Sequence, residues 1–251
     1  MPVNRVIAAA AVVAFALPFL AAHAQAAQLK VLSTTSFKGA LEELGPQFEK
    51  ATENKVTLSF APTAVIKTQI EQGAVFDVAV LTSAVTDGLA SAGKIVPDSR
   101  IVARAGMGVA ILNGAPKPDL STVEAFKSAL MNAKSIGFYG QGASRAGFEA
   151  LFNKIGIADA LASKIKLLQT GAPEGVAKGE VEIGLSPISE IIPTPGVQVA
   201  GPFPADIQTY LVLSAGISAD SKATAAAAAF INFLAGPSTV PVLKAKGMEP
   251  G

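Results

Sequence analysis

The sequence of 251 residues contains no cysteine and no tryptophan, only two tyrosines, and a single histidine, His23. Without cysteine there are no disulfides, no thiolate metal sites and no thiol nucleophile. The scarcity of large aromatic rings with hydrogen-bonding edges argues against a stacking platform for bases or sugars. These absences narrow the chemistry to hydroxyl, carboxylate, amine and backbone groups.

The amino terminus has the pattern of a secretory signal peptide. Arg5 precedes an almost unbroken apolar run from residue 6 to 20, and Ala22-His23-Ala24 forms an A-x-A cleavage signal. The run is shorter than the ~20 apolar residues that a transmembrane helix requires. We therefore expect residues 1–24 to be a signal peptide cleaved near Ala24, and the mature chain to be a soluble periplasmic protein.

Cleavage also removes His23, so the mature chain would have neither imidazole nor thiol. That excludes Ser-His-Asp and Cys-His catalysis and ordinary zinc or copper sites, and we expect no metal and no cofactor. Arg5 is one of 20 Lys and Arg residues, so 19 would remain against 19 Asp and Glu. A balanced charge argues against nucleic acid as a partner, because phosphate backbones require a basic face.

The mature chain alternates short β-branched runs with amphipathic helical segments, the pattern of βαβ units and a mainly parallel sheet. The first series predicts strands at 28–33, 55–60 and 77–81, and helices at 39–51, 64–72 and 86–92. The second predicts strands at 107–113, 135–139, 165–169, 183–186, 197–200 and 208–214. Ser121-Thr122-Val123-Glu124 is a capping box, so a helix is expected to run from there to about residue 132. Further helices are expected at 144–155, 223–234 and 238–246.

The two series predict an α/β protein with two lobes. We expect residues 25–104 and 207–251 to form lobe I and residues 105–206 to form lobe II. The chain would cross between lobes near Arg104 and return near Asp206. Two such crossings make a hinge, and the cleft between two lobes is a usual place for a small ligand.

Hydroxyl groups recur where predicted strands lead into helices. Thr35 and Ser36 follow the first predicted strand, and Thr63 directly precedes the second predicted helix. Ser144 opens a helix of the second series, and Ser186 ends a strand. Unpaired N–H groups at a helix start favour an anion, and a hydroxyl adds a donor without adding charge. The alternative for Ser36 is an ordinary N-cap, which stabilises by about 1 kcal/mol.

Charged side chains near these junctions are few. Arg145 could hold a carboxylate or oxyanion through two parallel hydrogen bonds, or simply be a solvated arginine in a first helical turn. Glu149, Glu174 and Glu190 lie near predicted junctions, and most glutamates at such places are surface residues. We assign no catalytic residue. A GxxxxGK[ST] loop is absent, so we do not propose ATP hydrolysis.

Several short motifs occur in an order known from one family. These are the segment 31–41, Ser59-Phe60-Ala61-Pro62-Thr63 with 69–77, Ala146-Gly147, and Ile183-Gly184-Leu185. In them the mature chain resembles the molybdate-binding proteins of ABC importers over essentially its whole length. The resemblance implies a type II periplasmic-binding fold that holds an oxyanion through neutral donors. It places Ser36 and Thr63 at the two binding serines and Ala146 at a backbone donor.

The chain departs from that family in ways that concern the ligand. Pro187 stands where the family has a ligand-contacting tyrosine, Arg145 replaces a proline, and Pro62 interrupts the second motif. The family's valine-bearing helix motif is not clear, and 171–175 stands in its place. The segments 114–119 and 189–192 resemble those of a branch of the family that includes a periplasmic aconitate isomerase.

The resulting hypothesis is a monomeric binding protein that captures molybdate, tungstate or a carboxylate for the permease of an ABC importer. An isomerase acting on a tricarboxylic acid is the alternative, and nothing positive favours a third possibility, a periplasmic sensor or chaperone partner. The candidate ligand-binding residues are Thr35, Ser36, Thr63, Ser144, Arg145, Ala146 and Ser186.

Overall fold

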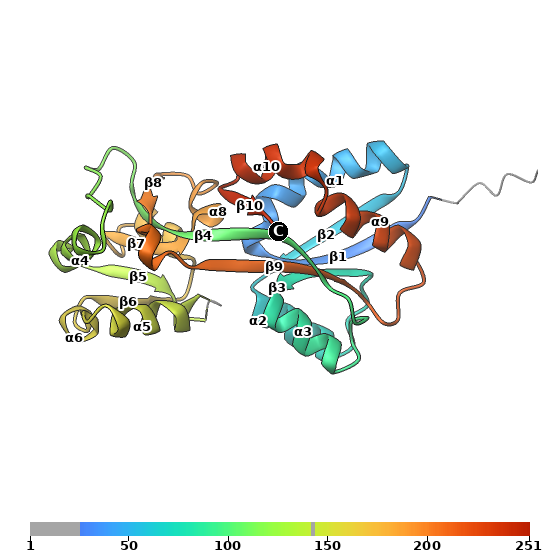
Figure 1. Ribbon diagram of the computed structural model, residues 1–251, viewed down its shortest axis with the longest axis horizontal. Helices are drawn as coiled ribbons and strands as arrows, with labels where there is room; N and C mark the ends of the chain where they lie inside the picture. The colour runs from blue at the N-terminus through green and yellow to red at the C-terminus, as the bar shows by residue number, and fades with distance from the viewer. Residues whose placement is uncertain (1–25, 142–143) are drawn as a thin grey trace, which may run out of the picture.

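Two groups of helices and strands, joined by two long strands, make up the computed structural model of this α/β protein (Figure 1). The structure describes residues 26–141 and 144–251. The predicted signal peptide and its cleavage site near Ala24 lie outside the described residues, as do Gly142 and Ala143 of one predicted junction.

The first group is built on three parallel strands, with β1 between β2 and β3. The predicted βαβ units are present here. Gly73 and Gly93, predicted to end two helices, have φ of +90° and +71° just beyond them, a conformation in which glycine is favoured. The elements are β1 (Gln28–Thr34), η1 (Thr35–Phe37), α1 (Lys38–Thr52), β2 (Lys55–Ala61), α2 (Thr63–Glu71), β3 (Val78–Thr82) and α3 (Ser83–Ser91).

The second group repeats this plan, with β5 in parallel between β6 and β7. The predicted helix after the capping box is present, but Thr122, not Ser121, is its N-cap: its hydroxyl accepts a hydrogen bond from the Ala125 N–H at 3.1 Å. The elements are α4 (Val123–Asn132), β5 (Ile136–Tyr139), α5 (Arg145–Lys154), α6 (Ala158–Leu161), β6 (Ile165–Leu168), α7 (Ala172–Ala177), β7 (Ile183–Pro187), α8 (Ile188–Ile191), β8 (Val197–Pro202) and η2 (Ala205–Ile207).

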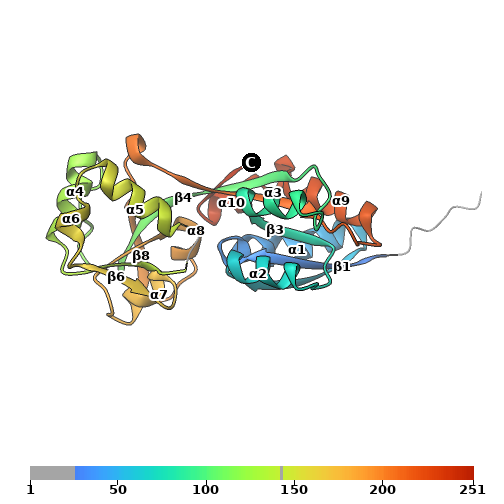
Figure 2. The same cartoon turned by 90° about the horizontal axis from the view of Figure 1, so that it is seen from below.

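Two antiparallel strands, β4 (Arg100–Leu112) and β9 (Tyr210–Ile217), run between the groups in both views (Figures 1 and 2). The first part of β4 pairs with β9, and its second part pairs with β7 and β8. The sequence predicted only the part of β4 from residue 107 onward. Its proposed lobe boundaries, 104/105 and 206/207, stay a prediction.

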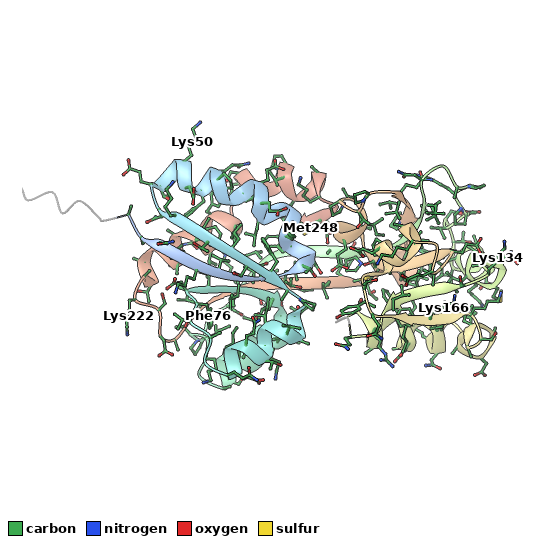
Figure 3. The ribbon with its side chains drawn as sticks, turned by 180° about the vertical axis from the view of Figure 1, so that it is seen from behind. Lys50, Phe76, Lys134, Lys166, Lys222 and Met248 are labelled. Carbon is green, nitrogen blue, oxygen red and sulfur yellow. The ribbon has the colours of Figure 1, made fainter. Side chains whose placement is uncertain are left out.

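Each group has its own apolar core. In the first, Leu29, Val31 and Phe48 are buried with Phe230 and Leu234 of the C-terminal helices, and Figure 3 shows Met248 and Phe76 in the same half. The Phe48 and Phe230 ring centroids lie 4.9 Å apart. The remaining elements are α9 (Thr224–Leu234), η3 (Pro237–Thr239), α10 (Val240–Ala245) and β10 (Met248–Pro250).

The second core is rich in phenylalanine. Phe126, Phe138, Phe148 and Phe203 are all buried, and the Phe126 and Phe203 ring centroids are 4.8 Å apart. Aromatic pairs at such distances contribute about 0.5–1.5 kcal/mol beyond the area they bury. Each group therefore has buried apolar side chains of its own, and β4 and β9 connect the two groups.

No single helix in the described part of the chain is long and apolar enough to cross a membrane. Within residues 26–141 and 144–251, one bent pair of helical segments, Thr224–Leu234 with Pro237–Ala245 at 54°, meets the criteria of length and composition. Ala227, Phe230, Ile231 and Leu234 of α9 are buried in the first core.

Candidate anion-binding site

The carboxyl ends of β1 and β2 bring two predicted hydroxyl residues to one edge of the first sheet. Thr34 pairs with Ala61 in the parallel register. Ser36 and Thr63 each follow two residues later, at the start of a helical segment, and both are buried. Parallel strands end at a common edge, which is where ligands bind in open α/β sheets.

The second group supplies hydroxyls in the same way. Ser186 is buried near the carboxyl end of β7. Ser144 follows the neighbouring strand β5 and is the N-cap residue of α5. Because β5 and β7 are parallel, these two residues also lie at one edge of their sheet.

The two edges meet around one small cavity of about 50 Å³. A single water needs about 10–15 Å³ by this kind of measure, so the cavity has room for a compact group of atoms. Its walls combine hydroxyls from both halves with an acidic side chain that the sequence did not assign. The lining includes Thr35, Ser36, Thr63, Tyr139, Gln141, Ser144, Ser186 and Glu190.

Arg145 and Ala146 are not among the residues that line this cavity. The Arg145 guanidinium donates through Nε to Glu149 Oε1 at 2.9 Å and through Nη1 to the Gly140 carbonyl at 3.0 Å. The bond to Gly140 ties the first turn of α5 to the residue directly after β5, whereas the bond to Glu149 lies within α5. Ala146 is exposed in that turn. The roles of both residues as ligand contacts stay predictions.

Glu190 lines the cavity, although it was not among the predicted ligand-binding residues. Ser36 Oγ donates to Glu190 Oε1 at 2.5 Å, and Ser186 Oγ donates to Glu190 Oε2 at 2.7 Å. One carboxyl therefore joins hydroxyls from both groups of elements. The available signal was the spacing, because Glu190 stands four residues after Ser186 on the helical turn predicted to follow β7.

The environment of Glu190 changes its acidity. Burial is the largest effect and raises the pKa of the carboxyl above its ordinary value of 4.5, and the nearby Glu174 carboxylate raises it further. The hydrogen bonds from Ser36 and Ser186 lower the pKa but do not cancel the effect of burial. The protonated form is thus favoured relative to a carboxyl in water.

A second, larger cavity of about 510 Å³ adjoins the first. The two share Thr35, Pro62, Tyr139 and Glu190. The larger cavity also reaches Ser189, whose buried hydroxyl has no hydrogen-bond partner in the described part of the chain. The cleft therefore extends beyond the space that one compact anion would fill.

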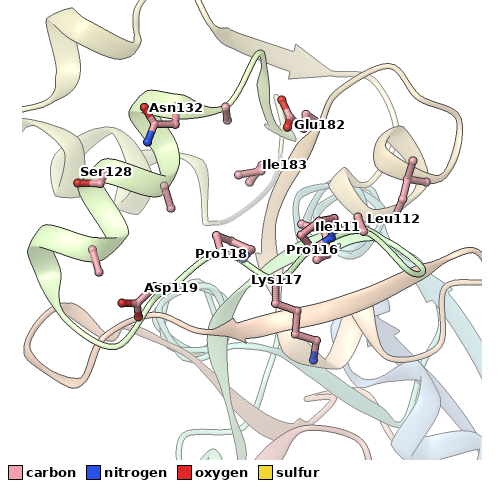
Figure 4. Close-up of a pocket in the computed structure, with 14 residues that line it drawn as sticks. Ile111, Leu112, Pro116, Lys117, Pro118, Asp119, Ser128, Asn132, Glu182 and Ile183 are labelled. Carbon is pink, nitrogen blue, oxygen red and sulfur yellow. The ribbon is translucent and has the colours of Figure 1, made fainter.

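Another cavity, of about 600 Å³, lies elsewhere (Figure 4). It is bounded by α4, the 113–119 loop and the start of β7, whereas the hydroxyls gather at the other end of β7. Its two carboxylates, Asp119 and Glu182, already accept backbone N–H groups from Ser121 and Lys134. Within residues 26–141 and 144–251, no cluster of three or more His, Cys, Asp or Glu residues could hold a metal ion.

The fold is that of a class of two-lobed binding proteins, and comparisons with known proteins identify the family. The model of the bacterial extracellular solute-binding protein family matches residues 29–249. The chain therefore belongs to that family.

Individual relatives fall into two functional groups. The chain is 30% identical to the molybdate-binding protein ModA of Azotobacter vinelandii over 251 residues, covering 94% of this chain and 95% of that protein. It is 28% identical to an aconitate isomerase of a Pseudomonas species over 241 residues, covering 93% and 91%.

Among solved structures, the periplasmic molybdate-binding protein of A. vinelandii superposes with a TM-score of 0.74 at 24% identity, covering 89% of this chain and 99% of that one. The expected type II periplasmic-binding fold is thereby confirmed.

Proposed function

We propose that this protein is a periplasmic solute-binding protein that captures a small anion between its two lobes and delivers it to the permease of an ABC importer. The ligand is a molybdate- or tungstate-type oxyanion or a carboxylate, and the protein acts as a monomer after removal of its signal peptide. Family membership and the molybdate-binding relative support this assignment.

The observation that carries the proposal is the convergence of Ser36 and Thr63 from one half with Ser144 and Ser186 from the other on a single small cavity. Neutral hydroxyl donors on both sides can hydrogen-bond an anion without adding charge to the cavity. Closure of two bodies around a ligand is a common form of domain motion in binding proteins.

A thermal-unfolding panel on the mature protein tests the proposal. Molybdate, tungstate, sulfate, phosphate, citrate and trans-aconitate are compared at equal concentration. A ligand present at 100 times its Kd adds about 2.7 kcal/mol of stability. For a chain of this size the melting temperature changes by about 2–4 °C per kcal/mol. We expect a rise of several degrees with at least one anion, and no rise with any of them would contradict the proposal.

A second candidate function, isomerisation of a tricarboxylic acid, is favoured by one specific observation. Glu190 is a carboxyl with a raised pKa beside two hydroxyl donors, as a general acid–base requires. It would take a proton from a methylene carbon next to the double bond and return it at the far carbon, which shifts the double bond without a redox step. The relatedness to an aconitate isomerase supports this candidate.

Conversion of trans- to cis-aconitate, followed by proton nuclear magnetic resonance, distinguishes the two functions. If the protein is an isomerase, the wild type converts the substrate and Glu190→Gln does not. If it is only a binding protein, neither converts it. Glu180→Gln, at an exposed position of the same half, serves as the control for preparation and folding.

A further inference from the structure

The Glu190 carboxyl occupies the position where the proposed anion would be held. Its two oxygens accept the hydroxyl protons of Ser36 and Ser186, at 2.5 and 2.7 Å. These two serines come from opposite halves of the molecule, and both belong to the predicted ligand set. When it is ionised, Glu190 is therefore an internal anion bound to donors that the external anion needs.

An ionised Glu190 and a bound anion exclude one another. Both serine protons are committed to the carboxylate, so they are not available to a ligand. Two negative charges within a partly buried cavity also repel each other much more than they would in water. A neutral Glu190 removes both obstacles, because it no longer requires the serine protons and can donate its own proton to the ligand.

The charged and titratable groups around Glu190 do not compensate its charge. Glu174 lies near enough to raise its pKa. Lys38 and Glu42 of α1 line the adjoining cavity, but the Lys38 ammonium pairs with Glu42 at 2.5 Å. Tyr139 of β5 lines both cavities. Acidic groups thus outnumber unpaired cations around the carboxyl, which makes neutralisation by a proton the available route.

We infer that Glu190 is a proton-controlled occupant of the anion site, and that a protein molecule in which Glu190 is ionised takes up one proton on Glu190 when it binds an anion. The inference rests on the proposed function and adds a condition on which ligands the site can bind. The site accepts a ligand that can receive a hydrogen bond from a carboxylic acid at the place where two serines meet. Its affinity is set by the fraction of protein with Glu190 neutral.

Two quantities follow. Where Glu190 is ionised in the free protein, the Kd rises by about tenfold per pH unit, because only the neutral fraction binds. Replacing Glu190 by Gln supplies a permanently neutral side chain of the same shape. Glu190→Gln should therefore bind with a Kd that does not change with pH and that lies at least tenfold below the wild-type value at pH 9.

Titration calorimetry from pH 7 to 9, with molybdate and trans-aconitate as probes, tests the inference. Each titration is repeated in two buffers of different ionisation enthalpy, which gives the number of protons taken up. We expect uptake by the wild type to approach one proton per anion at pH 9, and uptake by Glu190→Gln to be zero. Glu180→Gln should behave as the wild type, and unchanged unfolding temperatures without ligand show that the variants are folded.

Three possible results distinguish failure of the inference about Glu190 from failure of the proposed function. Binding by the wild type without proton uptake at pH 9 overturns the inference and leaves the proposed function in place. Tighter binding by Glu190→Gln without uptake by the wild type also overturns it, since the ionised side chain would then simply move aside. If neither the wild type nor Glu190→Gln binds any anion of the panel, the proposed function itself fails.

Discussion

At the scale of single residues, Glu190 differs from the other acidic side chains near the cleft because serine hydroxyls donate to both of its oxygens. Glu149 pairs with Arg145 and Glu42 pairs with Lys38, each four residues along an exposed helix face. Pairs of that kind contribute only a few tenths of a kcal/mol. The chemistry of the site therefore depends on one carboxyl and the hydroxyls around it.

The raised pKa of Glu190 predicts a pH-dependent stability. The folded protein holds this proton more tightly than the unfolded chain, so wild-type stability falls as the pH rises from about 4.5 through the raised pKa. Glu190→Gln lacks this decline. We expect its free energy of unfolding, relative to the wild type, to increase over that window and then level off.

Urea denaturation at closely spaced pH values from 4 to 8 measures this difference. Glu180→Gln is the matched control, because its side chain is exposed and should give a difference that does not vary with pH. If the difference in unfolding free energy between Glu190→Gln and the wild type stays constant, or decreases as the pH rises, then the pKa of Glu190 is not raised in the folded protein.

Part of the site could be predicted from the sequence and part could not. Ser36, Thr63 and Ser186 follow from the rule that strand ends in parallel sheets carry the ligand contacts. The role of Glu190 depends on Ser36, which is 154 positions away, and no local pattern indicates that contact. The pairing of Arg145 with Glu149 has the i,i+4 spacing of a helix, but it was not predicted, because Arg145 was expected to hold a ligand or to be solvated.

At the scale of elements, the sequence predicted the parallel units well and the short helices poorly. The α7 helix was missed because Gly171, Pro173 and Gly175 disfavour a helix in isolation. Packing explains why a glycine stands at position 175, because a Cβ there would lie 2.5 Å from Leu168 Cδ1. The tertiary contact between α7 and the sheet overrides the local preference.

The same packing predicts the effect of filling a neighbouring glycine. A Cβ on Gly184 of β7 would lie 2.9 Å from the Ala172 carbonyl oxygen of α7. Because a backbone atom cannot move aside easily, Gly184→Ala should cost about 1–3 kcal/mol and lower the melting temperature by about 2–4 °C per kcal/mol.

Gly88→Ala provides the comparison. Gly88 is exposed inside α3, and a Cβ there would meet nothing within 4 Å. Alanine should stabilise this helix by about 0.5–1 kcal/mol. Thermal unfolding of both variants tests the packing of α7 on β7. A Gly184→Ala protein as stable as the wild type would mean that α7 stands further from the sheet.

At the scale of the whole molecule, the polar cavity that Ser36, Ser186 and Glu190 line lies between the two groups of elements, each with its own apolar cluster. Phe48 and Phe230 stabilise one half, Phe126 and Phe203 the other, and β4 with β9 connects them. Composition and strand–helix alternation were enough to predict two α/β lobes. The antiparallel course of the connecting strands was not predicted, because the first part of β4 lacks a clear alternating pattern.

The central claim is that the hydroxyls lining the small cavity between the two groups hold one small anion. Titration calorimetry of the wild type and of the Ser36→Ala/Thr63→Ala double variant, with molybdate and trans-aconitate, tests it most directly. We expect one anion per wild-type chain and a loss of about a hundredfold or more in affinity for the double variant, since hydrogen bonds to a charged group contribute about 1.5–3 kcal/mol each. Unchanged thermal unfolding without ligand would show that the variant is folded. Equal affinity of the two proteins, or no binding of either anion by the wild type, would contradict the account.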